Sequence, residues 1–231
     1  MSHDDAPTIP LGLEVRDISV TFDAPRRRLA PNRSVPRPVL DGVSLSIRAG
    51  EVVALLGPSG SGKSTLLRVI AGILSPDRGQ VRVNGVDVTD RPTHRRGVGM
   101  VFQDNQLFPH MSVRDNVAFG PKMAGAPLAE RTDRATRWLQ RVGLAGFDDR
   151  RVTDLSGGEA KRVALARTLA AHPSVVLLDE PLTGLDRELH DRLALELREL
   201  LHDTHMTVLL VTHDHSEAAT IASRSVQLDE L

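Results

Sequence analysis

The sequence predicts an α/β fold in which helices cover both faces of a mostly parallel sheet. Three short and nearly continuous apolar runs are typical of strands buried on both faces: Glu51–Leu56, Val175–Leu178 and Val208–Val211. Leucines at helical spacing, from Leu189 to Leu200, separate the last two runs. Because strands that alternate with helices pair in parallel, this order predicts a parallel sheet.

The chain before the first buried run predicts two half-buried strands joined by a loop. Leu13–Val20 and Val43–Ile47 alternate apolar and polar residues. The segment Ala24–Pro38 between them contains five Arg, four Pro and no acidic residue, and proline at that density is incompatible with a helix or a central strand. Its arginines could contact anionic lipid headgroups or bound nucleotide, or the segment could be a solvated loop.

A helical pattern interrupts the alternation after the short strands Gln80–Asn84 and Val98–Phe102. Apolar residues at three- and four-residue spacing, among them Trp138, predict an inserted α-helical subdomain over about residues 104–158, with Trp138 as its core anchor. Residues 1–103 and 159–231 would then form the core. We expect the whole chain, 1–231, to be a single domain.

Composition narrows the possible functions. The formal net charge is −1, from 29 Lys and Arg against 30 Asp and Glu, which argues against a nucleic-acid partner. No cysteine is present, so a disulfide or a thiol nucleophile is excluded. No run of about 18 apolar residues occurs, and the acidic start does not resemble a signal peptide. We therefore expect a soluble protein whose membrane role, if any, comes through a partner.

The first chemical motif is a glycine-rich turn between a buried strand and a helix. Gly57-Pro58-Ser59-Gly60-Ser61-Gly62-Lys63-Ser64-Thr65 fits G-x-x-x-x-G-K-[ST]. Glycines let the backbone wrap phosphates, and the amides of the following helix present positive potential. Lys63 is expected on the β- and γ-phosphates and the Ser64 hydroxyl on Mg²⁺. The motif predicts a P-loop NTPase that binds a nucleoside triphosphate and Mg²⁺.

The second motif is an acidic pair that follows the buried strand Val175–Leu178. Asp179, at the end of that strand, could hold Mg²⁺ directly or through water. Glu180 extends beyond it and could polarise the attacking water as a general base. The same residues, with Pro181, could instead form a simple turn, but the phosphate loop upstream favours the catalytic interpretation.

A third motif, Leu155-Ser156-Gly157-Gly158-Glu159, begins a helix. A serine cap and glycine amides at a helix N-terminus form a second phosphate-binding element. One protein has little use for two such elements on one γ-phosphate unless they come from different copies. With its position shortly before the acidic strand, this motif resembles the signature of ATP-binding cassette (ABC) proteins.

Other residues match the ABC pattern in order. Gln103 resembles the Q-loop glutamine, Leu185-Asp186 the D-loop, and His213 the switch histidine, while Phe22 looks like the aromatic residue that stacks on adenine. The resemblance implies a RecA-like P-loop core that uses ATP and Mg²⁺, with an antiparallel β subdomain at the N-terminus of the fold. It extends from about Leu13 to Leu228.

The resemblance also implies the roles of the site residues. Two copies would form a head-to-tail homodimer with two ATP molecules at the interface. Lys63, Glu180, Gln103 and His213 would be catalytic, and His213 would contact the γ-phosphate. The Mg²⁺ ligands would be Ser64, Gln103 and Asp179. The nucleotide would contact Phe22, Gly57, Ser59, Gly60, Ser61, Gly62, Lys63, Ser64, Thr65, Gln103, Asp179 and His213, together with Ser156, Gly157, Gly158 and Glu159 of the second copy.

The stretch Val101–Val113, followed by Asn116–Gly120, resembles the importer branch, which serves uptake of thiamine, iron, polyamines, sulfate or sugars. Integral membrane permease subunits would dock near Gln103–Phe119, although Leu107, Phe108 and Phe119 could equally be core residues. An extracytoplasmic substrate-binding protein is expected in the same system. The chain would lie peripherally on the cytoplasmic face of the inner membrane, as a short form without a C-terminal regulatory domain. An exporter subunit, a non-transport ABC ATPase and a kinase-type P-loop protein remain alternatives.

Overall fold

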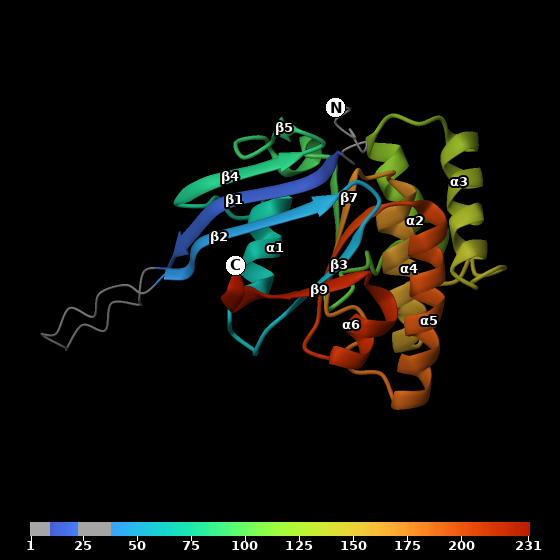
Figure 1. Cartoon of the computed structure of the whole chain (residues 1–231). Coiled ribbons are helices and arrows are strands. Elements are labelled where there is room, and N and C mark those ends of the chain that lie inside the picture. Colours follow the sequence, from blue (N-terminus) through green and yellow to red (C-terminus); the bar gives the residue numbers. More distant parts are fainter. Residues whose placement is uncertain (1–9, 23–37) are drawn as a thin grey trace, which may run out of the picture.

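The structure is a computed structural model that describes residues 10–22 and 38–231. The arginine-rich segment therefore lies outside the described residues, except for Pro38. The polypeptide forms two sheets with helices between and beside them (Figure 1). The smaller sheet is antiparallel, in the strand order β2-β1-β4-β5. Its strands are β1 (Leu11–Thr21), β2 (Pro38–Arg48), β4 (Arg78–Val83) and β5 (Val86–Asp87).

The larger sheet has five strands in the order β6-β7-β8-β3-β9, and all its pairings are parallel. Its strands are β3 (Val52–Leu56), β6 (Val98–Val101), β7 (Val175–Asp179), β8 (Thr207–Val211) and β9 (Arg224–Gln227). The three buried runs are adjacent at the centre of this sheet, which confirms the predicted parallel arrangement. The edge strand β9 was not predicted, because it contains one apolar residue among polar ones.

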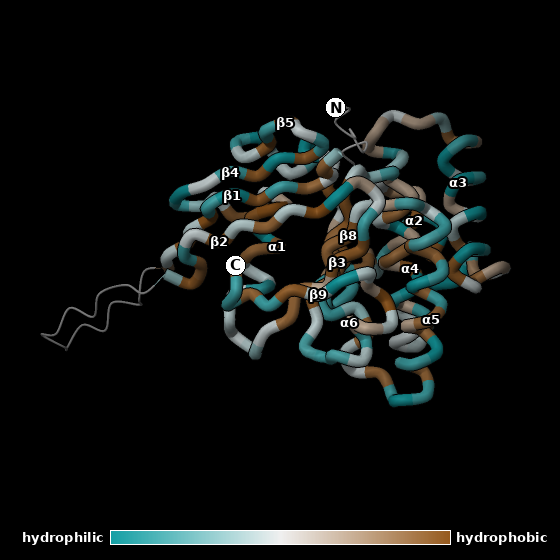
Figure 2. Tube along the Cα trace, in the orientation of Figure 1, coloured by the Kyte–Doolittle hydropathy of each residue, from teal (hydrophilic) through white to brown (hydrophobic). Residues whose placement is uncertain are grey.

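Side chains that alternate along the central strands point into two separate cores. Leu177 and Leu209 join the core that contains α1 (Lys63–Ala71) and the antiparallel sheet. Leu178 and Leu210 join the core on the opposite face, which contains the remaining helices. Figure 2 shows the apolar residues concentrated where these layers meet. The helices of the second layer are α2 (Val113–Met123), α3 (Leu128–Arg141), α4 (Gly157–Ala170), α5 (Arg187–Thr204) and α6 (His215–Ile221).

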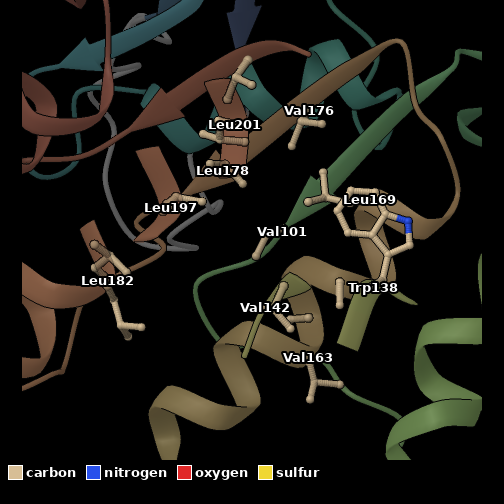
Figure 3. Close-up of a cluster of buried hydrophobic side chains, with 14 of the residues drawn as sticks. Val101, Trp138, Val142, Val163, Leu169, Val176, Leu178, Leu182, Leu197 and Leu201 are labelled. Atoms are coloured by element: carbon tan, nitrogen blue, oxygen red, sulfur yellow. The ribbon is translucent and has the colours of Figure 1, made fainter. Parts of the chain in front are cut away.

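The predicted insertion contains α2 and α3, which pack against each other and against α4. An isolated β-bridge between Ser112 and Arg151 brings the two ends of the insertion together. Trp138 is 4% exposed and lies in the same core as Val101 and Leu169, so its predicted role as an anchor is confirmed (Figure 3). Since α4 also contacts β6, it connects the inserted helices to the parallel sheet.

Within residues 10–22 and 38–231, the secondary structure also includes three short 3₁₀ helices: Thr93–Arg95, Val152–Asp154 and Leu228–Glu230. Among the described residues, none of the helices combines the length and the apolar composition needed to cross a bilayer.

Candidate functional site

The carboxyl ends of four neighbouring parallel strands carry most of the predicted site residues. The strand order β6-β7-β8-β3 places Gln103, the Asp179–Glu180 pair, His213 and the phosphate loop in succession at one edge of the sheet. Ligands of open α/β sheets bind outside this edge, because the loops that follow parallel strands converge there. The topology therefore brings together residues that lie more than a hundred positions apart in the sequence.

The phosphate loop connects β3 to α1 through three glycines with positive φ: Gly57 at 153°, Gly60 at 80° and Gly62 at 107°. A Cβ atom at Gly62 would lie 2.9 Å from the carbonyl oxygen of Val39, so a side chain has no room there. Gly62 caps α1 without a side-chain hydrogen bond. The first amides of the helix are therefore free for an anion. Ser59 and Gly60 are exposed at the tip of the loop, and Thr65 is half-buried in the first turn.

Lys63 is the first residue of α1, and its side chain folds back into the phosphate loop. Its side chain is 5% exposed, and its ammonium group donates hydrogen bonds to the carbonyl oxygens of Gly57, at 2.6 Å, and Pro58, at 2.8 Å. In the part of the chain that the structure describes, no carboxylate forms an ion pair with this ammonium group, and a buried cation held by carbonyl dipoles retains most of its capacity to bind an anion. This arrangement fits a phosphate group.

Two oxygen atoms of the kind that coordinate Mg²⁺, from Ser64 of α1 and Asp179 of β7, lie close together. The Ser64 hydroxyl donates to Asp179 Oδ1 at 3.0 Å. Burial raises the pKa of Asp179, the Ser64 hydrogen bond opposes this shift, and the neighbouring Glu180 adds to it. A nearby cation would favour the ionised carboxylate. Within residues 10–22 and 38–231, the buried Ser61 hydroxyl has no hydrogen-bond partner, and it therefore remains available to a ligand.

Glu180 occupies a strained backbone position with φ 46°. Its Oε2 accepts hydrogen bonds from Gln103 Nε2 at 3.3 Å and from Thr183 Oγ1 at 3.1 Å. Its Oε1 lies 3.4 Å from His213 Nδ1. Three side chains from separate loops thus hold both oxygens of this carboxylate at the edge of the sheet.

The Ser156–Glu159 motif lies at the N-terminus of α4 and forms a capping box. Glu159 N–H donates to Ser156 Oγ at 3.3 Å, and Ser156 N–H donates to Glu159 Oε2 at 2.7 Å. Hydrogen bonding of the Glu159 carboxylate to the backbone N–H and to the side chain of Ser156 lowers the pKa of Glu159. Ser156 and Gly157 are exposed, while Gly158 packs against Leu189. In the described part of the chain, this motif makes no hydrogen bond with the phosphate loop or with the acidic pair.

Phe22 is half-exposed at the end of β1, so its ring is free to stack on a planar ligand.

Several residues that support the site were not predicted. Thr183 holds Glu180, and Arg167 of α4 binds the turn after Gln103 through the carbonyl oxygens of Asn105 and Gln106. Arg167 is recognisable in the sequence only as one basic residue in a helix, since its partners lie about sixty positions away.

A cavity of about 430 Å³ lies between α3, α4 and α5. Its lining includes none of the predicted nucleotide residues, so the strand-end site is identified by its geometry and chemistry and not by this cavity.

Comparison with known proteins identifies the family. The sequence profile described as "ABC transporter" matches residues 40–183, which contain the phosphate loop, Gln103, the Ser156–Glu159 motif and the acidic pair. The chain belongs to the ABC transporter family. This ABC chain is 54% identical over 190 residues to the "Fe(3+) ions import ATP-binding protein FbpC" of Streptomyces coelicolor, covering 82% of the chain and 55% of the relative.

Two further relatives carry import or transport names. The "Sulfate/thiosulfate import ATP-binding protein CysA" of Mycobacterium tuberculosis is 51% identical over 185 residues, or 80% of this ABC chain and 53% of the relative. The "Putrescine transport ATP-binding protein PotG" of Escherichia coli is 43% identical over 212 residues, or 92% and 53%. The ABC chain thus spans about half the length of the curated relatives it matches.

A solved structure confirms the fold class. The ATP-binding cassette MJ0796, described as a dimer in a post-hydrolysis state bound to ADP and Pi, superimposes on this ABC chain with a TM-score of 0.80. Sequence identity is 30%, and the match covers 94% of each chain.

Proposed function

We propose that this ABC protein is the ATP-binding and ATP-hydrolysing subunit of a membrane importer. The observation that carries the proposal is the convergence of Lys63, Asp179, Glu180 and His213 at one edge of the parallel sheet. The import and transport names of relatives that are 43–54% identical support the direction of transport. The cargo would be recognised by other polypeptides of the system.

The phosphate loop would bind the triphosphate. The ammonium group of Lys63 would exchange its two loop carbonyls for phosphate oxygens, and the free amides of α1 would complete the contacts. Ser64, Asp179 and Gln103 fit the ligand set that we propose for Mg²⁺, which neutralises phosphate charge when bound. Phe22 would stack on the adenine ring.

Glu180 would act as the general base. Its carboxylate would accept the proton of the attacking water, while the contact with His213 orients one oxygen and the contacts with Gln103 and Thr183 orient the other. A carboxylate fixed at both oxygens loses little entropy on reaching the reactive geometry. The strained backbone of Glu180 is consistent with a position retained for chemistry.

A second copy of the chain would complete each site. Ser156 and Gly157 are exposed at the start of α4 and, among residues 10–22 and 38–231, make no hydrogen bond with the phosphate loop, which supports a role in trans. The dimeric state described for the similar cassette MJ0796 supports a head-to-tail homodimer with Ser156, Gly157, Gly158 and Glu159 at the nucleotide of the partner.

The permease would dock on the surface near Gln103–Phe119. Phe108 and Phe119 are half-buried and their ring centroids lie 4.6 Å apart, while Asn116 binds the backbone of Phe108. This makes a rigid, partly apolar surface directly after Gln103. Such docking would hold the subunit at the cytoplasmic face of the inner membrane, in a system with an extracytoplasmic substrate-binding protein.

The substitution Glu180→Gln tests the proposal. Removing the base while keeping its shape should lower ATP hydrolysis about a hundredfold or more, leave ATP binding intact and accumulate a nucleotide-bound dimer. Turnover and dimerisation would be measured by phosphate release and by size-exclusion chromatography with light scattering. Glu188→Gln, an exposed change on α5, is the matched control. Normal turnover by the Glu180 variant would refute its role as the base.

A further inference from the structure

A buried hydrogen-bonded pair lies beside the histidine that the mechanism uses. Thr212 is 1% exposed and follows β8, and Glu217 is 3% exposed on α6. The Thr212 hydroxyl donates to Glu217 Oε2 at 2.6 Å and accepts the N–H of Asp214 at 3.0 Å. One hydroxyl therefore connects the residues on both sides of His213.

The backbone around His213 is fixed by these contacts and by two others. Thr212 N–H donates to the carbonyl oxygen of Leu55 in β3, which anchors the residue before the histidine to the sheet. Asp214 caps α6 through the N–H groups of Ser216 and Glu217, which anchors the residue after it.

The histidine ring has little support of its own. The His213 side chain is 56% exposed, and its recorded side-chain partner in the described structure is Glu180. An exposed ring with one partner explores several rotamers unless its backbone is held in one place. The position of the ring therefore depends on the anchors at Thr212 and Asp214.

Glu217 is surrounded by groups from every element that packs on it. His190 of α5 lies 3.9 Å from Glu217 Oε2, and Lys161 of α4, Asp214 and His213 contribute electrostatically. Burial raises the pKa of Glu217, and the Thr212 hydrogen bond and His190 oppose the shift. Its Oε1 has no hydrogen-bond partner within the described ranges. A buried carboxyl with one unpaired oxygen costs stability, so its presence calls for another role.

We propose that Thr212 and Glu217 form a positioning pair that holds His213 where it meets Glu180. This inference rests on the proposed function, because it assumes that His213 acts in ATP hydrolysis. Neither residue touches the nucleotide in this scheme, and both act through the backbone of His213. Because His190 of α5 lies 3.9 Å from the same carboxylate, the pair also connects the position of His213 to the helix that follows Asp186.

The test compares two buried threonines at the ends of β8. Thr212→Val removes the hydroxyl and keeps the shape, and Thr212→Ser keeps the hydroxyl. Thr207→Val is the matched control, since Thr207 is 4% exposed and its hydroxyl accepts the N–H of Gly50 at 3.1 Å, away from the site. The measurements are kcat and KM for ATP hydrolysis, together with the thermal midpoint of each variant.

We expect Thr212→Val to lower kcat by about tenfold or more with an unchanged KM, because a displaced ring impairs the chemical step and not ATP binding. Thr212→Ser should restore kcat, and Thr207→Val should keep it even if its Tm falls equally. Normal turnover by Thr212→Val, or equal losses of kcat in Thr212→Val and Thr207→Val, would overturn the inference.

A second pair of variants tests the same point from α6. Glu217→Gln retains an acceptor oxygen for Thr212 and should keep kcat within about threefold, whereas Glu217→Leu should match Thr212→Val. Equal turnover by the Gln and Leu variants would overturn the inference, and this result is decisive even if Thr212→Val does not fold. If the wild-type protein itself fails to hydrolyse ATP, the proposed function fails instead.

Discussion

Replacing Arg167 with Met should loosen the turn that follows Gln103. The Arg167 guanidinium donates to the carbonyl oxygens of Gln106 at 2.7 Å and Asn105 at 2.9 Å, and it lies 5.4 Å from the centroid of the Phe108 ring. Asn105 and Gln106 have φ values of 60° and 45°, which residues other than glycine rarely adopt. A turn with two such residues needs external support to persist.

The structure sets the size of the effect. A hydrogen bond from a charged donor contributes at least about 1.5 kcal/mol, and the contact with the ring contributes about 0.5 kcal/mol. Arg167→Met therefore removes about 3.5 kcal/mol of support from the turn. Since about 1.4 kcal/mol corresponds to a factor of ten, the turn should open about three-hundredfold more often.

Amide hydrogen exchange at residues 105–108 measures this opening. The amide of Phe108, which donates to Asn116 Oδ1 at 2.8 Å, is the best reporter because it is partly buried. Arg134→Met is the control. Arg134 lies on α3, which packs against α4, and its guanidinium forms an ion pair at 2.7 Å with Glu130 of the same helix. Exchange at Phe108 that stays within about threefold of wild type in the Arg167 variant would refute the reasoning.

Three further outcomes are expected. Arg96→Met removes three donor nitrogens that bind the carbonyl oxygens of Val69, Ile70, Thr89 and Arg91, so it should cost about 4.5 kcal/mol and lower the Tm by about 13 °C in thermal unfolding. Gly62→Ala should abolish nucleotide binding in a fluorescence titration while secondary structure persists in circular dichroism, because its Cβ would collide with Val39 and Leu40 of β2 and its φ is 107°. Glu217→Gln should gain stability relative to wild type as the pH rises above about 4.5 in a series of melts. Burial raises the pKa of Glu217, so the folded wild type holds this proton longer than the unfolded chain and loses stability as the pH increases.

The central sheet and the loops at the carboxyl ends of its strands could be predicted from sequence because their signals are local. Apolar runs such as Val175–Leu178 identify strands by composition alone, and the topology of parallel strands then places Asp179 and His213 next to the phosphate loop. The edge strand β9 escaped prediction because Arg224–Gln227 is mostly polar and pairs only on one side.

The supporting contacts could not be predicted, because they join distant positions. Arg96 reaches the end of α1 about 26 residues upstream, and Arg167 reaches a turn about 61 residues upstream. The strained φ of Glu180 likewise depends on the hydrogen bond from its N–H to Val211 in the adjacent strand. A single sequence contains no local pattern for such contacts, so the structure was needed to find them.

The two helices that we propose to bind phosphate differ in how they begin, and this difference has a thermodynamic consequence. The N-terminus of α4 is capped by the side chains of Ser156 and Glu159, whereas the N-cap residue of α1 is Gly62, which has no side chain to accept hydrogen bonds from the first N–H groups of the helix. A bound anion would therefore act as the N-terminal cap of α1, by accepting hydrogen bonds from these N–H groups. Affinity for that anion and rigidity of the helix become two aspects of one equilibrium, in which tightening either strengthens the other.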